Sequence, residues 1–258
     1  MATGYGGNWM SDQLIERDMV RENLARNLAQ LEDAITAACR AANRSREEVE
    51  LIAVSKNHPI TTLIEAAGLG LRLFGENRVQ EFAAKSAELD PSIRGLMRVH
   101  LIGHLQSNKA AKAVEIFDAI DSIDSLKLAE RLNEAAARLS KRLPILLEIK
   151  LSHEETKAGL APDSAELAEL LERLPSLENL DAQGLMTIAP FDVPETETRE
   201  CFRALRTLRD RLSAAHPRLN LPVLSMGMSG DFPLAIAEGA TRIRVGTALF
   251  GTRPGYPK

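Results

Sequence analysis

The strongest constraint on the fold is the regular alternation of short apolar segments with helical patterns. Helical periodicity appears over residues 60–67, 78–89, 125–141, 164–174 and 195–215. Eight segments have the length and apolar content of buried β-strands: residues 50–55, 72–74, 98–102, 119–123, 145–151, 179–187, 222–226 and 242–245. Because strands that alternate with helices run in the same direction, this order predicts an α/β fold with a parallel sheet.

Eight such units in about 200 residues fit a closed (β/α)8 barrel, the TIM barrel, better than an open doubly wound sheet, although the count alone leaves both open. Residues 11–42 predict a further long helix with Leu24, Leu28, Leu31 and Ile35 on one apolar stripe. We therefore expect a single barrel domain over residues 11–258 with an additional N-terminal helix. Residues 1–10 are expected to form a flexible extension.

Composition narrows the classes of protein to which this chain can belong. The chain is 26% charged with a net charge of -4, which argues against a nucleic-acid partner. It shows no secretory pattern, and no segment approaches the ~20 apolar residues that a membrane span needs. Cys39 and Cys201 are far apart and indicate neither a disulfide framework nor a metal site. These features predict a cytoplasmic protein, and we expect a monomer because no apolar outer stripe is evident beyond the N-terminal helix.

A lysine follows the first predicted strand directly, in the segment Ser55-Lys56-Asn57-His58-Pro59. In a barrel of this kind, the residues after the C-terminal strand ends converge on one mouth. A lysine partly removed from water there loses some preference for its charged form, and the neutral amine can form a Schiff base with an aldehyde. A solvated loop lysine is the alternative, and position alone does not decide between them.

Two turns after the last predicted strands have the composition of phosphate sites. They are Leu224-Ser-Met-Gly-Met-Ser-Gly-Asp231 and Arg244-Val-Gly-Thr247. Small residues at strand-to-helix turns leave backbone N–H groups free to bind an anion, and phosphate sites in these barrels recur after strands seven and eight. Either turn could be an ordinary glycine-rich turn. Together beside Lys56, they predict a site for a phosphorylated aldehyde.

Arg244 lies two residues before Gly246, so strand alternation projects its side chain toward the mouth. If it faces the ring nitrogen of pyridoxal 5'-phosphate (PLP), that nitrogen stays unprotonated, because a guanidinium group can only donate hydrogen bonds. An ion pair with a barrel carboxylate such as Glu148 is the other interpretation, and the sequence leaves both open.

Six segments of this chain resemble those of the pyridoxal phosphate homeostasis protein family, in the same order and over nearly the whole length. They are Ala53-Val-Ser-Lys56, Phe74-Gly-Glu-Asn-Arg-Val-Gln-Glu81, His100-Leu-Ile-Gly-His-Leu-Gln-Ser-Asn-Lys109, Gly184-Leu-Met186, Leu224-Ser-Met-Gly-Met-Ser229 and Arg244-Val-Gly-Thr-Ala-Leu-Phe-Gly251. That family is similar in fold to the barrel domain of alanine racemase. The resemblance implies PLP as the cofactor.

The resemblance also implies a role for each matching residue. It implies that Lys56 carries PLP as a Schiff base and that Arg244 faces the pyridine nitrogen. It implies that Ser229, Gly246 and Thr247 hold the phosphate group. It also implies that Asn77 and Met226 line the pocket of the ring.

A comparison with related racemases argues against catalytic turnover. Racemisation needs a base on each face of the reacting carbon, and related racemases use a tyrosine from a second domain. The tyrosines here are Tyr5 and Tyr256, near the two chain ends, and we expect no second domain. We therefore expect no catalytic residue, and a protein that holds PLP in vitamin B6 homeostasis, with apo PLP-dependent enzymes as candidate recipients.

Two other functions stay open. A PLP-dependent amino-acid racemase of low activity would use Lys56 with His100 or His104, although histidines near strand ends more often satisfy local backbone groups. A cofactor-free Schiff-base aldolase would use Lys56 alone. The aspartates around the fourth predicted strand, Asp118, Asp121 and Asp124, are expected to cap and solvate its ends.

Overall fold

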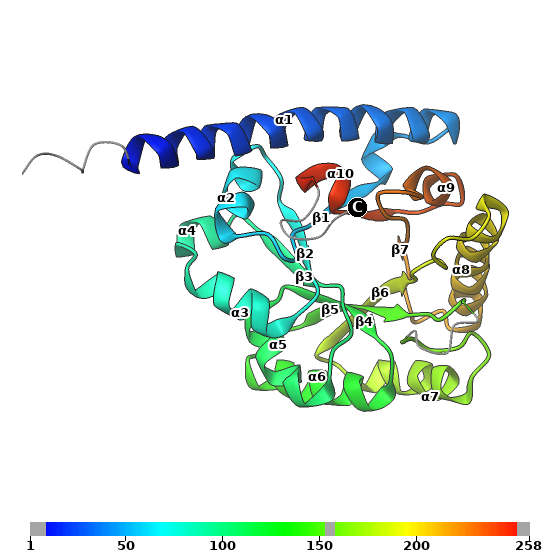
Figure 1. Ribbon diagram of the computed structural model, residues 1–258. Helices are drawn as coiled ribbons and strands as arrows, with labels where there is room; N and C mark the ends of the chain where they lie inside the picture. Colours follow the sequence, from blue (N-terminus) through cyan, green and yellow to red (C-terminus); the bar gives the residue numbers. More distant parts are fainter. Residues whose placement is uncertain (1–8, 153–157, 252–258) are drawn as a thin grey trace, which may run out of the picture.

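Eight parallel strands close into one barrel in the computed structural model, which describes residues 9–152 and 158–251 (Figure 1). The strands are β1 (Glu50–Val54), β2 (Leu73–Glu76), β3 (Arg98–Leu101), β4 (Ala119–Ile123), β5 (Leu143–Glu148), β6 (Leu180–Met186), β7 (Val223–Ser225) and β8 (Arg242–Val245). Pairing of β1 with β8, in the register Ile52 to Arg244, closes the ring. The predicted TIM barrel is confirmed, and the open doubly wound sheet is excluded.

Helices between the strands form the outer layer of the barrel. They are α2 (Ile60–Gly68), α3 (Val79–Ala87), α4 (Pro91–Arg94), α5 (Ala110–Ile116), α6 (Leu126–Arg138), α7 (Ala165–Arg173), α8 (Glu195–Ala215), α9 (Phe232–Ala237) and α10 (Thr247–Phe250), with 3-10 turns η1 (Arg46–Glu48), η2 (Ser107–Lys109) and η3 (Leu174–Ser176). The sequence did not predict α4, α5, α9 and α10, because helices of four to seven residues are too short to show a periodic pattern.

The long helix α1 (Trp9–Ala41) lies across α2, α9 and α10, outside the barrel ring (Figure 1). It begins two residues before the predicted start. Its apolar stripe is buried as predicted, with Leu24, Leu31 and Ile35 at most 4% exposed and Leu28 against the core. The side-chain amide of Asn27 also donates a hydrogen bond to the carbonyl of Leu249 in α10, at 3.0 Å. Residues 1–8 lie outside the described residues, so the predicted extension stays a prediction.

Strand β2 extends two residues beyond its predicted end, through Gly75 and Glu76. A glycine and a glutamate are unusual in a buried strand, which explains why the sequence pattern ended at Phe74. At Gly75 there is little room for a side chain, because an added Cβ would lie 2.7 Å from Ile52 Cγ2. Glu76 is fully buried, and Lys85 and Ser55 provide its polar contacts.

A polar network crosses the barrel interior toward the N-terminal ends of the strands. His100 Nδ1 lies 3.1 Å from Asp121 Oδ1, and Arg242 contacts Asp121 Oδ2 at 3.6 Å and Glu50 Oε2 at 2.6 Å. Burial alone would raise the pKa of Asp121, but the charges of His100, Arg242 and Arg244 hold it below its usual value. The capping role predicted for Asp121 is therefore wrong, because the side chain is buried in mid-strand and ion-paired.

The other two aspartates near β4 do lie at its ends. Asp118 accepts a hydrogen bond from the backbone of Val99 at 2.7 Å, and Asp124 Oδ2 lies 2.8 Å from His104 Nδ1. Only Asp121, at the centre of the strand, departs from the prediction.

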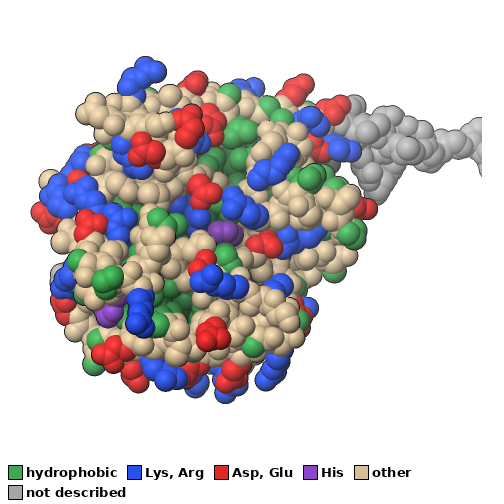
Figure 2. Space-filling view, turned by 180° about the vertical axis from the view of Figure 1, so that it is seen from behind, with side chains coloured by type: hydrophobic (Ala, Val, Ile, Leu, Met, Phe, Trp, Pro, Cys, Tyr) green, Lys and Arg blue, Asp and Glu red, His purple; other side chains and the backbone are tan. Residues whose placement is uncertain are grey.

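The molecular surface carries mixed charge. Acidic and basic side chains are interspersed over the face shown in Figure 2. Among the described helices, none is both long enough and apolar enough to cross a bilayer. Both cysteines, Cys39 and Cys201, are buried, and neither forms a disulfide.

Candidate functional site

Six of the seven residues predicted to bind the cofactor line one cavity of about 400 Å³ at the C-terminal ends of the strands. They are Lys56, Asn77, Ser229, Arg244, Gly246 and Thr247. These residues follow or end β1, β2, β7 and β8, so barrel closure brings the first and last parts of the chain to one mouth. This is the location at which barrels of this type carry their sites.

The seventh predicted residue, Met226, lies elsewhere. It is fully buried in the hydrophobic core, whereas Met228 is 37% exposed and lines the cavity. Strand β7 ends at Ser225, and Gly227 adopts a φ of +92°, which breaks the alternation on which the prediction relied. Met228 therefore replaces Met226 as the methionine that offers surface to a ligand.

A buried lysine supports the turn that carries Lys56. Lys85 Nζ donates hydrogen bonds to the carbonyl oxygen of Ser55 at 3.0 Å, to Glu76 Oε1 at 2.9 Å and to Glu81 Oε1 at 2.8 Å. The hydroxyl of Ser55 also donates to Glu76 Oε1, at 2.7 Å. Burial raises the pKa of Glu76, and Lys85 and Ser55 oppose this rise. The carbonyl group just before Lys56 is therefore fixed by a buried charge network.

The residue after Lys56 is held by the same network. Asn57 adopts a left-handed φ of +62°, and its backbone N–H donates to Glu81 Oε1 at 2.6 Å. The main chain is thus anchored on both sides of Lys56. Sequence reasoning missed this support, although Glu76 and Glu81 both belong to the segment over residues 74–81 and were left without a role.

Arg244 is 4% exposed, and its guanidinium group is oriented by neutral acceptors. Nη1 donates to Ser225 Oγ at 2.8 Å, and Nη2 donates to the carbonyl oxygen of Thr187 at 2.7 Å. The ion pair with Glu148 that the sequence left open is not among the contacts of the described residues, although the charge of Glu148 acts on Arg244. Arg244 lines the cavity, and its hydrogen bonds to Ser225 and Thr187 fix the orientation of its guanidinium group.

The two predicted phosphate turns lie next to each other. The backbone N–H of Ala248 approaches Ser229 Oγ at 3.4 Å and so joins the turn after β8 to the turn after β7. At Gly227 an added Cβ would lie 2.6 Å from the Cβ of Ala235, and at Gly246 it would lie 3.1 Å from the carbonyl oxygen of Val54. The turn after β7 therefore needs glycine at Gly227, where φ is also positive, and Gly246 lies in close contact with β1 and lines the cavity with its backbone.

The sequence matches the family described as alanine racemase, N-terminal domain, over residues 27–254. It is 40% identical to the pyridoxal phosphate homeostasis protein of Escherichia coli over 233 residues, which are 90% of this chain and 97% of that protein. It is 38% identical to the pyridoxal phosphate homeostasis protein of Haemophilus influenzae over 233 residues, covering 90% and 96%. The chain belongs to the pyridoxal phosphate homeostasis protein family. The resemblance inferred from the sequence is confirmed.

Solved structures agree with membership of the pyridoxal phosphate homeostasis protein family. PipY of Synechococcus elongatus, solved with PLP bound, is 46% identical with a TM-score of 0.78, covering 88% of this chain and all of that one. Alanine racemase of Clostridium difficile, 19% identical with a TM-score of 0.68, covers 92% of this chain and 58% of that one. At that identity the racemase shows the shared barrel fold and no more.

Neither histidine considered for racemase chemistry in this family member lines the cavity with Lys56. His100 is 5% exposed and contacts Asp121 inside the barrel. His104 is exposed, contacts Asp124 and lines a neighbouring cavity that Lys56 does not line. Tyr5 and Tyr256 lie outside the described residues.

A second cavity of about 530 Å³ adjoins the first and shares Asn77, Ile102 and Ile188 with it. Its own wall includes Glu148, at the end of β5, and Ser152. Burial, reinforced by the negative charge of Asp124, raises the pKa of Glu148 to about 7. Sequence reasoning named Glu148 only as a partner for Arg244, and its place at a strand end was the signal for a site role.

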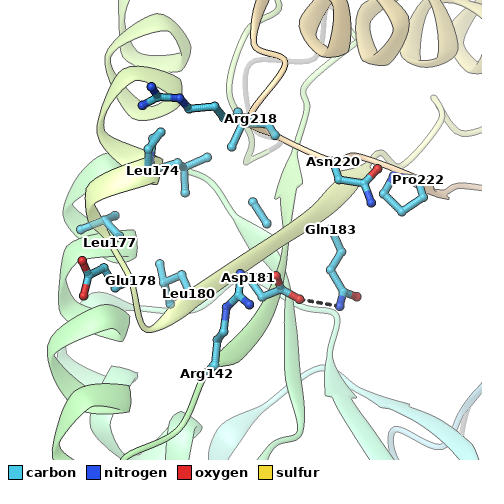
Figure 3. A pocket seen from close by; sticks show the side chains of 13 residues that line it. Arg142, Leu174, Leu177, Glu178, Leu180, Asp181, Gln183, Arg218, Asn220 and Pro222 are labelled. Atoms are coloured by element: carbon cyan, nitrogen blue, oxygen red, sulfur yellow. Dashed lines mark hydrogen bonds and ion pairs between the residues drawn. The ribbon is translucent and has the colours of Figure 1, made fainter.

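Another cavity, of about 710 Å³, lies at the opposite end of the barrel (Figure 3). It is lined at the starts of β5, β6 and β7, and two neighbouring side chains bind Asp181 in its wall. Asp181 Oδ1 pairs with Arg142 at 2.9 Å, and Asp181 Oδ2 accepts from Gln183 at 2.8 Å. The smaller mouth cavity, rather than this one, therefore brings together a lysine, an arginine and glycine turns.

Proposed function

We propose that this protein binds PLP as a Schiff base on Lys56 and takes part in intracellular vitamin B6 homeostasis without catalytic turnover. One observation carries the proposal: Lys56, Arg244 and the two adjacent glycine turns line a single cavity. Bound PLP would supply an aldehyde carbon for Lys56, a phosphate group and a pyridine ring. The residues fit that group, because one cavity wall combines the amine of Lys56, the hydroxyl groups of Ser229 and Thr247, and the backbone of Gly246.

Each lining residue has a role that follows from its chemistry. Ser229, Gly246 and Thr247 hold the phosphate through hydroxyl and backbone N–H donors. Asn77 and Met228 border the ring. Arg244 carries no acceptor, so a ring nitrogen facing it stays unprotonated and withdraws electrons weakly, which supports a carrier over an enzyme.

The named relatives support the same role. The curated relatives are named pyridoxal phosphate homeostasis proteins, and PipY was solved with PLP bound. We further propose a cytoplasmic monomer whose candidate partners are apo PLP-dependent enzymes. Mixing the loaded protein with an apo PLP enzyme and following the return of activity tests delivery, and retention of all PLP on Lys56 would refute it.

Substitution of Lys56 tests the covalent attachment. Wild-type protein incubated with PLP and desalted should keep the yellow absorbance, and borohydride reduction should fix the cofactor on the peptide that contains Lys56. Lys56→Ala should lose both signals, whereas Lys112→Ala, which changes a half-exposed surface lysine, should keep them. A reduced adduct on another lysine would overturn the assignment.

A second candidate function is a racemase of low activity, and a measurement of turnover with amino acids distinguishes it from a carrier. Sustained interconversion of amino-acid enantiomers by the loaded protein, lost in His104→Ala at equal PLP content, would replace the carrier with an enzyme. A Schiff-base aldolase would be colourless and would be trapped by borohydride only with its substrate present.

A further inference from the structure

Buried polar atoms without partners gather around the second cavity of the mouth. Within the described residues, Asn77 Oδ1, Glu148 Oε2 and Ser152 Oγ are buried and have no hydrogen-bond partner, and all three residues line this cavity. Glu148 and Ser152 are only 7% and 8% exposed. Leaving such groups unsatisfied is costly, and a carboxylate is the most costly of them. Their concentration on one cavity indicates a site for a ligand.

The three atoms define what that ligand must offer. A carboxylate oxygen and an amide oxygen accept hydrogen bonds, and a hydroxyl oxygen can also accept one. A primary ammonium group has three N–H donors and one positive charge, so it can satisfy all three acceptors and balance Glu148. An anion would face the carboxylate and is disfavoured.

The remaining walls indicate what carries the ammonium group. Ile102 and Ile188 line both cavities and form an apolar wall that the two cavities share. Such a surface can cover the methylene stem of an alkyl amine. Because the wall is shared, an amine bound at Glu148 lies in the cavity next to the one that Lys56 lines.

We propose that the second cavity binds the primary ammonium group of an alkyl amine, held by Glu148, Asn77 and Ser152, and that this amine takes PLP from Lys56. The removal of PLP from Lys56 rests on the proposed function, whereas the amine site does not. The charged groups that act on Glu148 are Asp124, Arg244 and His104, and Lys150 lines the same cavity.

The transfer balances without an oxidant or a reductant. The ammonium would leave one proton on Glu148 Oε2, and the neutral amine would then move into the first cavity and bond to the cofactor carbon that carries Lys56. The double bond from that carbon to Lys56 Nζ would be replaced by one to the amine nitrogen, and the two remaining N–H protons of the amine would pass to Nζ. One proton from solvent would then restore the charged lysine, and Glu148 would return its proton to solvent. The net change is an exchange of one amine for another on the same carbon.

The binding half is tested on the apo protein by calorimetry with butylamine and methylamine. We expect wild type to bind butylamine more tightly than methylamine, because only butylamine has a stem long enough to cover the apolar wall of Ile102 and Ile188. Glu148→Gln should weaken butylamine binding about tenfold or more, since it removes the charge. Glu115→Gln, at a half-exposed surface glutamate, is the matched control and should leave binding unchanged. Equal binding by wild type and Glu148→Gln would overturn the site.

The transfer half is tested on the loaded protein by following loss of the cofactor absorbance with two nucleophiles. Butylamine is charged near neutral pH, whereas O-methylhydroxylamine is largely uncharged and needs no ammonium site. Glu148→Gln should slow release by butylamine about tenfold or more and leave release by O-methylhydroxylamine unchanged. Equal slowing with both reagents would assign Glu148 to the cofactor and overturn the proposal. Failure of wild type to retain PLP would instead refute the proposed function, while the apo-protein arm would still decide the amine site.

Discussion

The ammonium group of Lys85 lies 3.0 Å from the carbonyl oxygen of Ser55, the residue that directly precedes Lys56. The same ammonium also lies 2.9 Å from the fully buried Glu76. The position of Lys56, the proposed cofactor lysine, therefore depends on the buried ion pair between Lys85 and Glu76, which holds the residue before it.

Lys85→Met should lower the free energy of unfolding by about 3 kcal/mol or more, because it leaves the carboxylate of Glu76 buried without its cation. Urea denaturation of the apo protein measures this change. Lys112→Met, in a half-exposed pair with Glu115, should change it by less than about 0.5 kcal/mol. Similar losses in the two variants would show that the buried pair contributes little. PLP affinity should also fall in Lys85→Met, because the turn at Lys56 loses its support.

Gly227→Ala should destabilise the protein by about 2–4 kcal/mol, since a positive φ and a close contact combine at this position. The added Cβ would lie 2.6 Å from the Cβ of Ala235. Gly230→Ala lies in the same turn, where a Cβ meets nothing within 4 Å, and should change stability by less than about 0.5 kcal/mol. Melting temperatures of both variants check the contrast, and equal melting temperatures would refute it.

Glu148→Gln should stabilise the apo protein in a manner that depends on pH. The pKa of Glu148 is raised from 4.5 to about 7 in the folded protein, so the folded state keeps a proton that the unfolded state has lost. Wild-type stability therefore falls as pH rises from about 4.5 to 7, and the penalty is complete above about pH 7. A pKa difference of about 2.5 sets an upper limit of about 3 kcal/mol.

Glutamine cannot ionise, so the variant escapes this penalty. Unfolding free energies of wild type and Glu148→Gln should agree near pH 4 and should diverge by about 1–3 kcal/mol near pH 8. A constant difference at all pH values would show that Glu148 titrates normally.

Arg244→Lys should destabilise the protein by about 1–3 kcal/mol although it keeps the positive charge. Two separate guanidinium nitrogens bind Ser225 Oγ and the carbonyl oxygen of Thr187, and one ammonium group cannot reproduce that geometry. Arg142→Lys, at a side chain that is 71% exposed, is the control and should be nearly neutral. Urea denaturation compares the two variants. An unchanged free energy of unfolding in Arg244→Lys would mean that the two guanidinium hydrogen bonds to Ser225 and Thr187 are not required.

The barrel and the mouth could be predicted from the sequence because both depend on local patterns. Apolar strands have a recognisable length, and the residues that follow them must converge when the sheet closes. Lys56 and Thr247 were predicted in this way, since each comes two residues after a strand end, and Ser229 was predicted from the turn that follows β7. Their roles toward the cofactor stay predictions.

The support of the site could not be predicted, because it depends on pairings that only the folded chain creates. Lys85 is an ordinary helical lysine in the sequence, and its burial against Glu76 follows from how α3 packs beside β2. The pairing of Asp121 could not be predicted for the same reason, since its partner His100 lies on a neighbouring strand. The misplacement of Met226 has a different cause, which is the left-handed Gly227 after β7.

The packing of α1 has a consequence for biosynthesis. Its apolar stripe is completed early in translation, but two of the helices that cover it, α9 and α10, belong to residues 232–250. While the ribosome is still making the intervening strands, the stripe of Leu24, Leu31 and Ile35 lacks the part of its native cover that α9 and α10 provide. Native packing of α1 is therefore completed only after residues 232–250 have been made, although α1 itself is among the first elements to emerge.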